Sequence, residues 1–215
     1  SAAEAAAGPD VATATDYTAA TAAGTWDYSN EVSSPFGYGL SYTTCEQTLD
    51  SVEISSDKKT ATVEVTVTNT GDVAGKSVVQ LYAQVPYIEG GIEKSAIQLV
   101  AYEKTDELAA DGSETVVLNV DMSNLASYDY EGAGTYIVDE GDYYFAIGDD
   151  SHDALNNILA AKGATGMVGT DGEDAAGDTS KVYDWHWDED TETFSVNAEG
   201  NESTNKLTER DYAMD

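Results

Sequence analysis

The chain has 215 residues, 41% of them hydrophobic, and carries 41 acidic against 9 basic residues, for a formal charge of −32. This length and apolar content suffice for one domain with a packed core and exclude wholesale disorder. A field of this sign repels nucleic acid and anionic lipid, so neither is expected as a partner. Because the acidic residues are spread nearly in proportion to length, they indicate a solvated coat, with a set of cation sites as the alternative.

Cys45 is the only cysteine, so no disulfide can form within the chain. No apolar run reaches the roughly eighteen residues that cross a bilayer, so membrane insertion is not expected. The chain begins at Ser1 and shows no signal peptide, which we interpret as a processed or excised boundary with any targeting information upstream. The compartment stays open, with an extracellular or cell-surface location favoured.

Residues 1–30 are rich in alanine and threonine and are predicted to be a lead-in or linker. The next 120 residues, 31–150, differ in their pattern of apolar and polar side chains and are predicted to form the β domain. Residues 60–68 alternate between apolar and polar side chains, which is typical of a strand with one wet face. Further strands are predicted at residues 76–84, 97–104, 115–121, 136–138 and 143–147. Glu140-Gly141-Asp142 predicts a hairpin turn between the last two strands.

About seven short strands with no long helix between them predict an antiparallel β-sandwich, with a closed barrel as the alternative. Residues 151–215 are predicted to form a short helix followed by an extended acidic tail or linker. The helix is expected at residues 152–162, where Leu155, Ile158 and Leu159 have helical spacing. Trp185 and Trp187 are expected to anchor an extended strip on a neighbouring surface.

Several ordered segments between residues 31 and 153 carry a more specific signal. They are SPFGYGLSYTT at 34–44, VTNTGDVAG at 67–75, VVQLY at 78–82, IEK at 92–94, LVAYEKT at 99–105, GDYY at 141–144 and AIG at 146–148. Together they resemble the fibronectin type III-like domain of family-three glycoside hydrolases, the β-glucosidases, β-xylosidases and their relatives. The resemblance implies an immunoglobulin-like sandwich with irregular extensions at both ends.

Residues 151–163 resemble the tail of this domain in a subset of the family with permuted domain order. In that subset the module lies between the two catalytic domains. The resemblance therefore implies that residues 205–215 are a linker toward a barrel domain.

Family members use two carboxylates, a nucleophile and a general acid/base, which belong to domains that this chain does not contain. No position matches the nucleophile motif, so no catalytic residue, cofactor or metal site is predicted and the chain alone is expected to be inactive. The predicted function is a non-catalytic accessory domain that braces the catalytic domains of the same enzyme and reaches the active-site rim. The alternative is an independent carbohydrate-binding or cell-surface adhesion module, whose oligo- or polysaccharide affinity would depend on Trp26, Trp185 or Trp187.

Trp26, Tyr28, Phe36 and Tyr38 cluster around the first of these motifs and are the candidate site residues. Large rings commonly anchor interfaces between domains, and we favour this role. Stacking of a sugar substrate on the rings is the alternative.

Two sets of polar residues could have either a structural or a catalytic or metal-binding role. Ser151, His152 and Asp153 include the residue types of a catalytic triad, but sequence neighbours rarely have triad geometry, so a helix N-terminal cap is favoured. Asp184 and His186 alternate with Asp188 and could offer metal ligands on one strand face. A solvated acidic edge is the favoured interpretation there.

Overall fold

The computed structural model describes residues 32–88, 91–168, 173–188, 194–196 and 200–201. The strands are β1 (Cys45–Ile54), β2 (Thr60–Asn69), β3 (Val78–Gln84), β4 (Gln98–Lys104), β5 (Ser113–Asp121), β6 (Ser127–Asp129), β7 (Thr135–Ile137), β8 (Gly141–Ile147) and β9 (Val182–Trp187). The helix α3 spans Ser151–Ala161, and two short 3₁₀ turns are η2 (Met122–Leu125) and η3 (Thr179–Lys181). None of the helices in this part of the chain is long and apolar enough to span a membrane.

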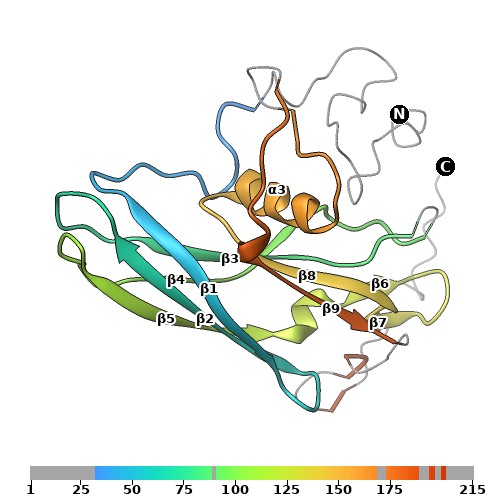
Figure 1. The fold of residues 1–215 in the computed structure, drawn as a ribbon. Helices are drawn as coiled ribbons and strands as arrows, with labels where there is room; N and C mark the ends of the chain where they lie inside the picture. The colour runs from blue at the N-terminus through green and yellow to red at the C-terminus, as the bar shows by residue number, and fades with distance from the viewer. Residues whose placement is uncertain (1–31, 89–90, 169–172, 189–193, 197–199, 202–215) are drawn as a thin grey trace, which may run out of the picture.

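Two antiparallel sheets face each other and enclose the core (Figure 1). One sheet has the order β1-β2-β5 and the other the order β4-β3-β8-β9, while β6 and β7 form a separate two-stranded hairpin. The sheets stay separate, so the predicted antiparallel sandwich is confirmed and the barrel alternative is not.

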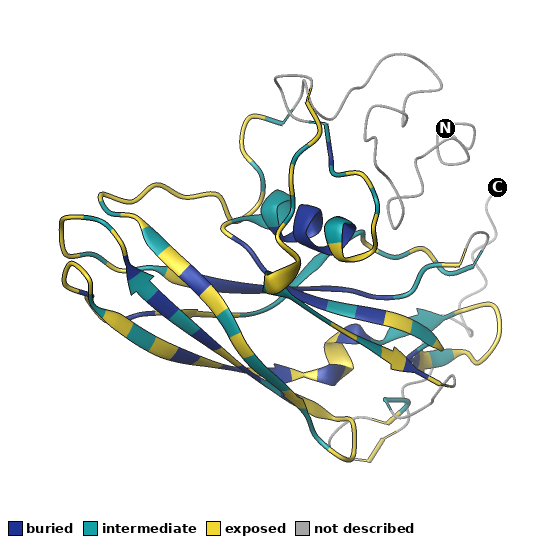
Figure 2. Cartoon of the chain, viewed as in Figure 1, coloured by how far each residue is buried: buried dark blue, intermediate teal, exposed yellow. Residues whose placement is uncertain are grey.

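The core forms where the inward faces of the two sheets meet. On β2, Ala61, Val63, Val65 and Val67 are buried, and the threonines and Glu64 between them are not. Figure 2 shows the same alternation along β5. A period of two therefore places one face of each strand in the core and leaves the other in water.

The four-stranded sheet is covered on its outer face as well. The helix α3 packs Ala154 and Ile158 against Tyr82 and Ala146, which lie on β3 and β8 (Figure 1). The approach is close at Gly148, where a Cβ would lie 2.5 Å from the backbone nitrogen of Ala154. Because helix and core lie on opposite faces, β3 is buried along almost its whole length, as its two-sided apolar sequence requires.

The first turn of α3 contains the triad-like set. Asp150 precedes the helix in an extended conformation, and its carboxylate accepts hydrogen bonds from the backbone nitrogens of His152 and Asp153. The cap is therefore Asp150, one residue before Ser151, and Asp153 adds the negative charge that a helix N-terminus favours.

The predicted hairpin between residues 136–138 and 143–147 is wrong. β7 pairs with β6, and β8 pairs with β3 and β9 instead. The turn residues near Gly141 are present, but they let the chain pass from the small hairpin into the large sheet rather than fold back on itself. Local turn chemistry does not decide which strands become neighbours in a sandwich, because many of its pairings are distant in sequence.

The sandwich also extends past residue 150, where the sequence pattern ended it. β9 is the edge strand beside β8, with Gly141 opposite Trp187 and Phe145 opposite Tyr183. Trp187 is buried in the main core and Trp185 packs against it. The two tryptophans thus belong to the sandwich itself rather than to a strip lying on a neighbour.

Candidate domain-docking surface

Residues 32–42, here named the opening segment, precede β1 and run beside the N-terminus of α3 (Figure 1). Two backbone carbonyls of the segment, those of Phe36 and Gly37, accept hydrogen bonds from the rest of the fold. The backbone nitrogen of Ser151 donates to the carbonyl of Phe36 at 2.9 Å. The buried Gln80 amide donates to the carbonyls of Gly37 at 3.0 Å and Asp149 at 2.8 Å. The segment is therefore tied to β3 and to the start of the helix.

The hydroxyl of Tyr82 completes this anchor. It donates to Gln80 Oε1 at 2.8 Å and lies 3.4 Å from the carbonyl oxygen of Phe36. Burial, with a smaller contribution from the charge of Asp150, raises the pKa of Tyr82 to about 12, so the phenol stays a neutral donor. Above it, Gly37 has a φ of 88°, a conformation that favours glycine, and no side chain would fit between Gln80 and Tyr82.

The side chains of the opening segment point into solvent although its backbone is held. Four large apolar residues form what we name the aromatic strip: Phe36, Tyr38, Leu40 and Tyr42, which are 66%, 53%, 88% and 102% exposed. Contiguous exposed apolar side chains of this size mark interaction sites. Of the four residues predicted at this site, Phe36 and Tyr38 lie on the strip.

The remaining two predicted residues, Trp26 and Tyr28, lie outside the described residues. Leu40 and Tyr42 were missed by sequence reasoning. The signal that could have found them is the continued alternation of large and small residues through GYGLSY, which keeps one apolar side chain at every second position.

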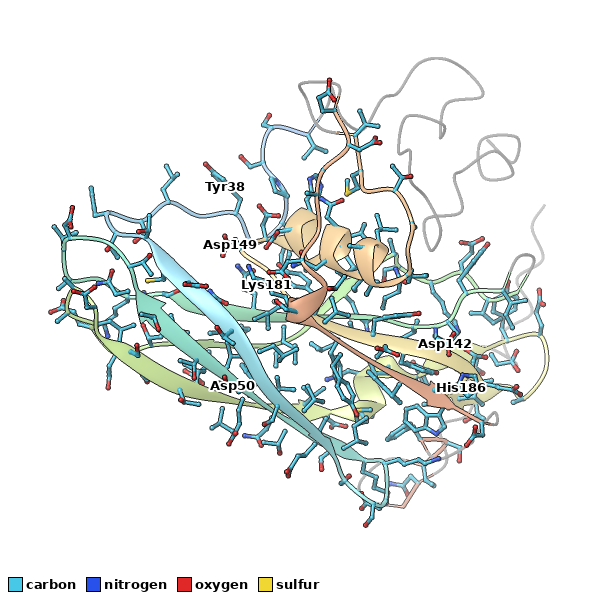
Figure 3. All side chains as sticks on the ribbon, viewed as in Figure 1. Tyr38, Asp50, Asp142, Asp149, Lys181 and His186 are labelled. Atoms are coloured by element: carbon cyan, nitrogen blue, oxygen red, sulfur yellow. The ribbon has the colours of Figure 1, made fainter. Side chains whose placement is uncertain are left out.

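Carboxylates flank the strip at the start of α3 (Figure 3). Desolvation raises the pKa of Asp149, and the neighbouring charge of Asp153 adds to this effect while Lys181 opposes it. Burial lowers the pKa of His152 against the pull of Asp150, so the imidazole tends to stay neutral. The rim of the strip is thus negative and favours a partner surface that carries lysine or arginine.

The tryptophans proposed for sugar stacking do not form an open platform. Trp187 is only 2% exposed, and its ring lies 5.2 Å from that of Tyr143. Trp185 stacks on the same tyrosine and lies 4.7 Å from Phe145. Both indole rings therefore pack against other aromatic rings of the sandwich.

A groove of about 420 Å³ runs between the edges of β4 and β5, lined by residues 99–103 and 117–119. Glu103 is the only charged residue in this lining. Hydrolysis of a glycosidic bond in most families needs two carboxylates on opposite sides of the bond. The groove offers one and does not have the composition of such an active site.

Within the described residues, no group of three or more histidine, cysteine, aspartate or glutamate side chains could hold a metal ion. Of the alternating residues, Asp184 and His186 lie on β9, the edge strand of the sheet, and Asp188 directly follows it. There His186 Nδ1 pairs with Asp142 Oδ1 of β8 at 2.6 Å, and both side chains are largely exposed (Figure 3).

We expect this pair to make the edge strand pH-sensitive. The hydrogen bond to Asp142, with smaller effects from the charges of Asp142, Asp188 and Glu140, raises the pKa of His186 above its usual value. A raised pKa means that stabilisation is fully present below the unfolded value and is lost as the pH rises through the folded value. The thermal midpoint of the wild type should therefore exceed that of His186→Gln at pH 5.5, and the difference should shrink by pH 8.

His152 provides an opposite control for the same titration. Its lowered pKa predicts stabilisation that is lost as the pH falls. The thermal midpoint of the wild type, relative to that of His152→Gln, should thus be higher at pH 8 than at pH 5.5. A wild-type advantage over His186→Gln that grows between pH 5.5 and 8 would contradict the pairing.

Comparisons with known proteins agree with this fold. Residues 77–151 match the family model of the fibronectin type III-like domain. The chain is 38% identical over 165 residues to beta-glucosidase A of Butyrivibrio fibrisolvens, which covers 65% of this chain and 20% of that protein. It is 35% identical over 141 residues to an exo-alpha-(1->6)-L-arabinopyranosidase of Bifidobacterium longum, covering 66% and 18%.

Among solved structures, beta-glucosidase 3B of Thermotoga neapolitana in complex with alpha-D-glucose superposes with a TM-score of 0.51 at 29% identity. The match covers 73% of this chain and 17% of that one. The chain thus spans a fifth or less of the proteins named here. This chain therefore carries the fibronectin type III-like domain of family-three glycoside hydrolases.

Proposed function

We propose that the chain is a non-catalytic accessory domain that braces the catalytic domains of a β-glucosidase-like hydrolase. The observation that carries this proposal is the aromatic strip, a set of exposed rings on a backbone that buried groups hold in place. Residues 1–30 and the acidic residues after β9 would connect the sandwich to its neighbours.

The physical chemistry of the strip fits contact with a folded neighbour. Burial of apolar surface contributes roughly 25 cal/mol per Å², so covering four large side chains is a substantial gain. Because the backbone is already ordered, less conformational entropy is lost on docking. The carboxylates beside the strip add a preference for a basic partner surface, which sets orientation more than affinity.

The proposal predicts that the chain alone does not hydrolyse p-nitrophenyl β-glucoside. In the longer gene product, the double variant Phe36→Ser, Tyr42→Ser should lower the thermal midpoint by several degrees and reduce activity. The same changes should leave the midpoint of the 215-residue chain nearly unchanged, since both rings are exposed there. Val117→Ser, at an exposed position on the other sheet, is the matched control.

Turnover by a clean sample of this chain would overturn the proposal. So would strip variants that leave both the stability and the activity of the longer protein unchanged. The alternative of an independent carbohydrate-binding module is less well supported, because Trp185 and Trp187 pack in the core. Saturable glycan binding by this chain that disappears on replacement of Trp26 would revive that alternative.

A further inference from the structure

The opening segment and the end of β9 lie at opposite ends of β8. At the C-terminal end, just after Ile147, the opening segment is bonded to the start of α3 through Phe36 and Ser151. At the N-terminal end, Trp187 closes β9 opposite Gly141, and beyond it Phe194 still packs against the main core. Seven residues of extended strand place these ends about 20 Å apart.

The Gly141 end of β8 carries a second group of rings, on the hairpin of β6 and β7 that directly precedes β8. Tyr128 and Tyr136 are cross-strand partners, and their ring centroids are 5.3 Å apart in an edge-to-face arrangement. Tyr136 is 45% exposed, and Tyr130 in the turn is 63% exposed. We name these three residues the tyrosine hairpin.

The turn of the tyrosine hairpin is held in one conformation. The Asp129 carboxylate accepts hydrogen bonds from the backbone nitrogens of Glu131, Gly132 and Ala133 at 3.1, 2.8 and 2.8 Å. These bonds lower the pKa of Asp129, because they stabilise its charged form. The hydroxyl of Tyr128 also donates to a backbone carbonyl of the turn at 2.9 Å.

The base of the hairpin is fixed as well. Lys94 forms an ion pair with Asp139, and both side chains are largely removed from solvent. The hydroxyl of Tyr143 donates to the carbonyl of Asp139 at 2.8 Å. Of the two hairpin strands, only Ile137 is buried. The anchoring thus orders an element whose strand residues, apart from Ile137, are at least partly exposed, and an ordered element loses little entropy on binding.

We propose that the tyrosine hairpin docks the folded part of the same enzyme that follows the sandwich, while the aromatic strip docks the part that precedes it. This inference rests on the proposed function. Trp187, at the end of the last strand, lies at the same end of β8 as the hairpin, and about four-fifths of a relative such as beta-glucosidase A lies outside the matched length. A second copy fits poorly, because two chains of charge −32 repel each other.

The partner surface expected at the hairpin follows from its chemistry. Tyrosine and arginine are both enriched at interfaces, tyrosine because its ring is apolar and its hydroxyl can hydrogen-bond. The exposed carboxylate of Glu131 beside the rings favours a surface that presents arginine or lysine. The hairpin therefore fits an apolar protein surface with a basic rim.

Hydroxyl-radical footprinting of the wild-type 215-residue chain and the longer gene product tests this directly. Oxidation of Tyr130 and Tyr136 should fall at least about fivefold in the longer protein, and that of Val117 should stay unchanged as the internal reference. The variant Tyr130→Ser should lower the thermal midpoint of the longer protein and leave that of the 215-residue chain nearly unchanged, since Tyr130 is the most exposed ring of the hairpin.

The outcomes separate this inference from the proposed function. Equal oxidation of the hairpin tyrosines in both proteins overturns the inference, even if Tyr38 and Tyr42 of the strip become protected and the bracing role stands. If the hairpin tyrosines are protected from oxidation in the longer protein and Tyr38 and Tyr42 are not, the result supports the inference and counts against docking by the aromatic strip. Protection of Tyr130 in the 215-residue chain by added cello-oligosaccharide would assign the hairpin to sugar binding and overturn protein docking.

Discussion

Replacing Trp187 by alanine is expected to destabilise the chain by about 3–5 kcal/mol, because the change removes a buried indole and leaves a cavity between the sheets. Trp187 is 2% exposed and packs against Tyr143 at the edge formed by β9. A loss of this size is a large share of the roughly 5–15 kcal/mol that stabilises a typical domain. Denaturant unfolding of wild type and variant measures it.

Tyr102→Ala is the matched control for Trp187→Ala, since this ring on β4 is mostly exposed. Its effect should stay within about 0.5 kcal/mol. A Trp187→Ala variant that keeps wild-type stability but loses affinity for a glycan would contradict the core assignment. It would also make the carbohydrate-binding alternative the leading one.

Replacing Asn157 by alanine should cost about 2–3 kcal/mol, because a buried backbone group then loses its partner. The Asn157 amide donates to the carbonyl of Ile147 at 3.0 Å and accepts from the backbone nitrogen of Asp178 at 2.7 Å. Its neighbour Asn156 likewise accepts from the nitrogen of Met167 at 2.8 Å. These two asparagines tie the segment after α3 to the sandwich.

Hydrogen exchange should show where the Asn157 change acts. We expect the amide of Asp178 and the start of β9 to exchange faster in Asn157→Ala, with β2 unchanged. Asn119→Ala, at an exposed position on β5, is the control and should change neither stability nor exchange. Equal stability of Asn157→Ala and the wild type would contradict the role of this amide as the link.

The parts of the fold that depend on local alternation could be predicted from the sequence. β2 was expected at residues 60–68 and spans Thr60–Asn69, because its valines face one side and its polar residues the other. β5 follows the same rule through Val116, Leu118 and Val120. Where one face of a strand is buried and the other is wet, the pattern alone suffices.

The parts of the fold that depend on pairing between strands distant in sequence could not be predicted from the sequence. Residues 182–187 alternate aromatic and polar side chains, but the acidic residues around them and the long loop before them favoured an extended tail. Only the pairing of β9 with β8 shows that the aromatic side chains on one face of β9 belong to the core. Likewise, nothing near Gly141 in the sequence tells that β7 pairs with β6 rather than β8.

The sequence places Phe36 and Tyr38 on one short segment but does not predict how far their rings are exposed. The motif around Phe36 and Tyr38 identified the segment, whereas the sequence could not tell whether rings near Pro35 pack inward or outward. That is decided by Gln80 and Tyr82 of β3, which bind the backbone of the segment and leave its side chains free. These two partners lie more than forty residues away in the chain.

The most direct test of the accessory-domain role is the intact mass of the native gene product, compared with the 22.7 kDa of this chain. A domain that spans a fifth or less of its relatives predicts a product several times heavier. A native product near 22.7 kDa would contradict that role, because no catalytic domain would then be present for the aromatic strip to dock.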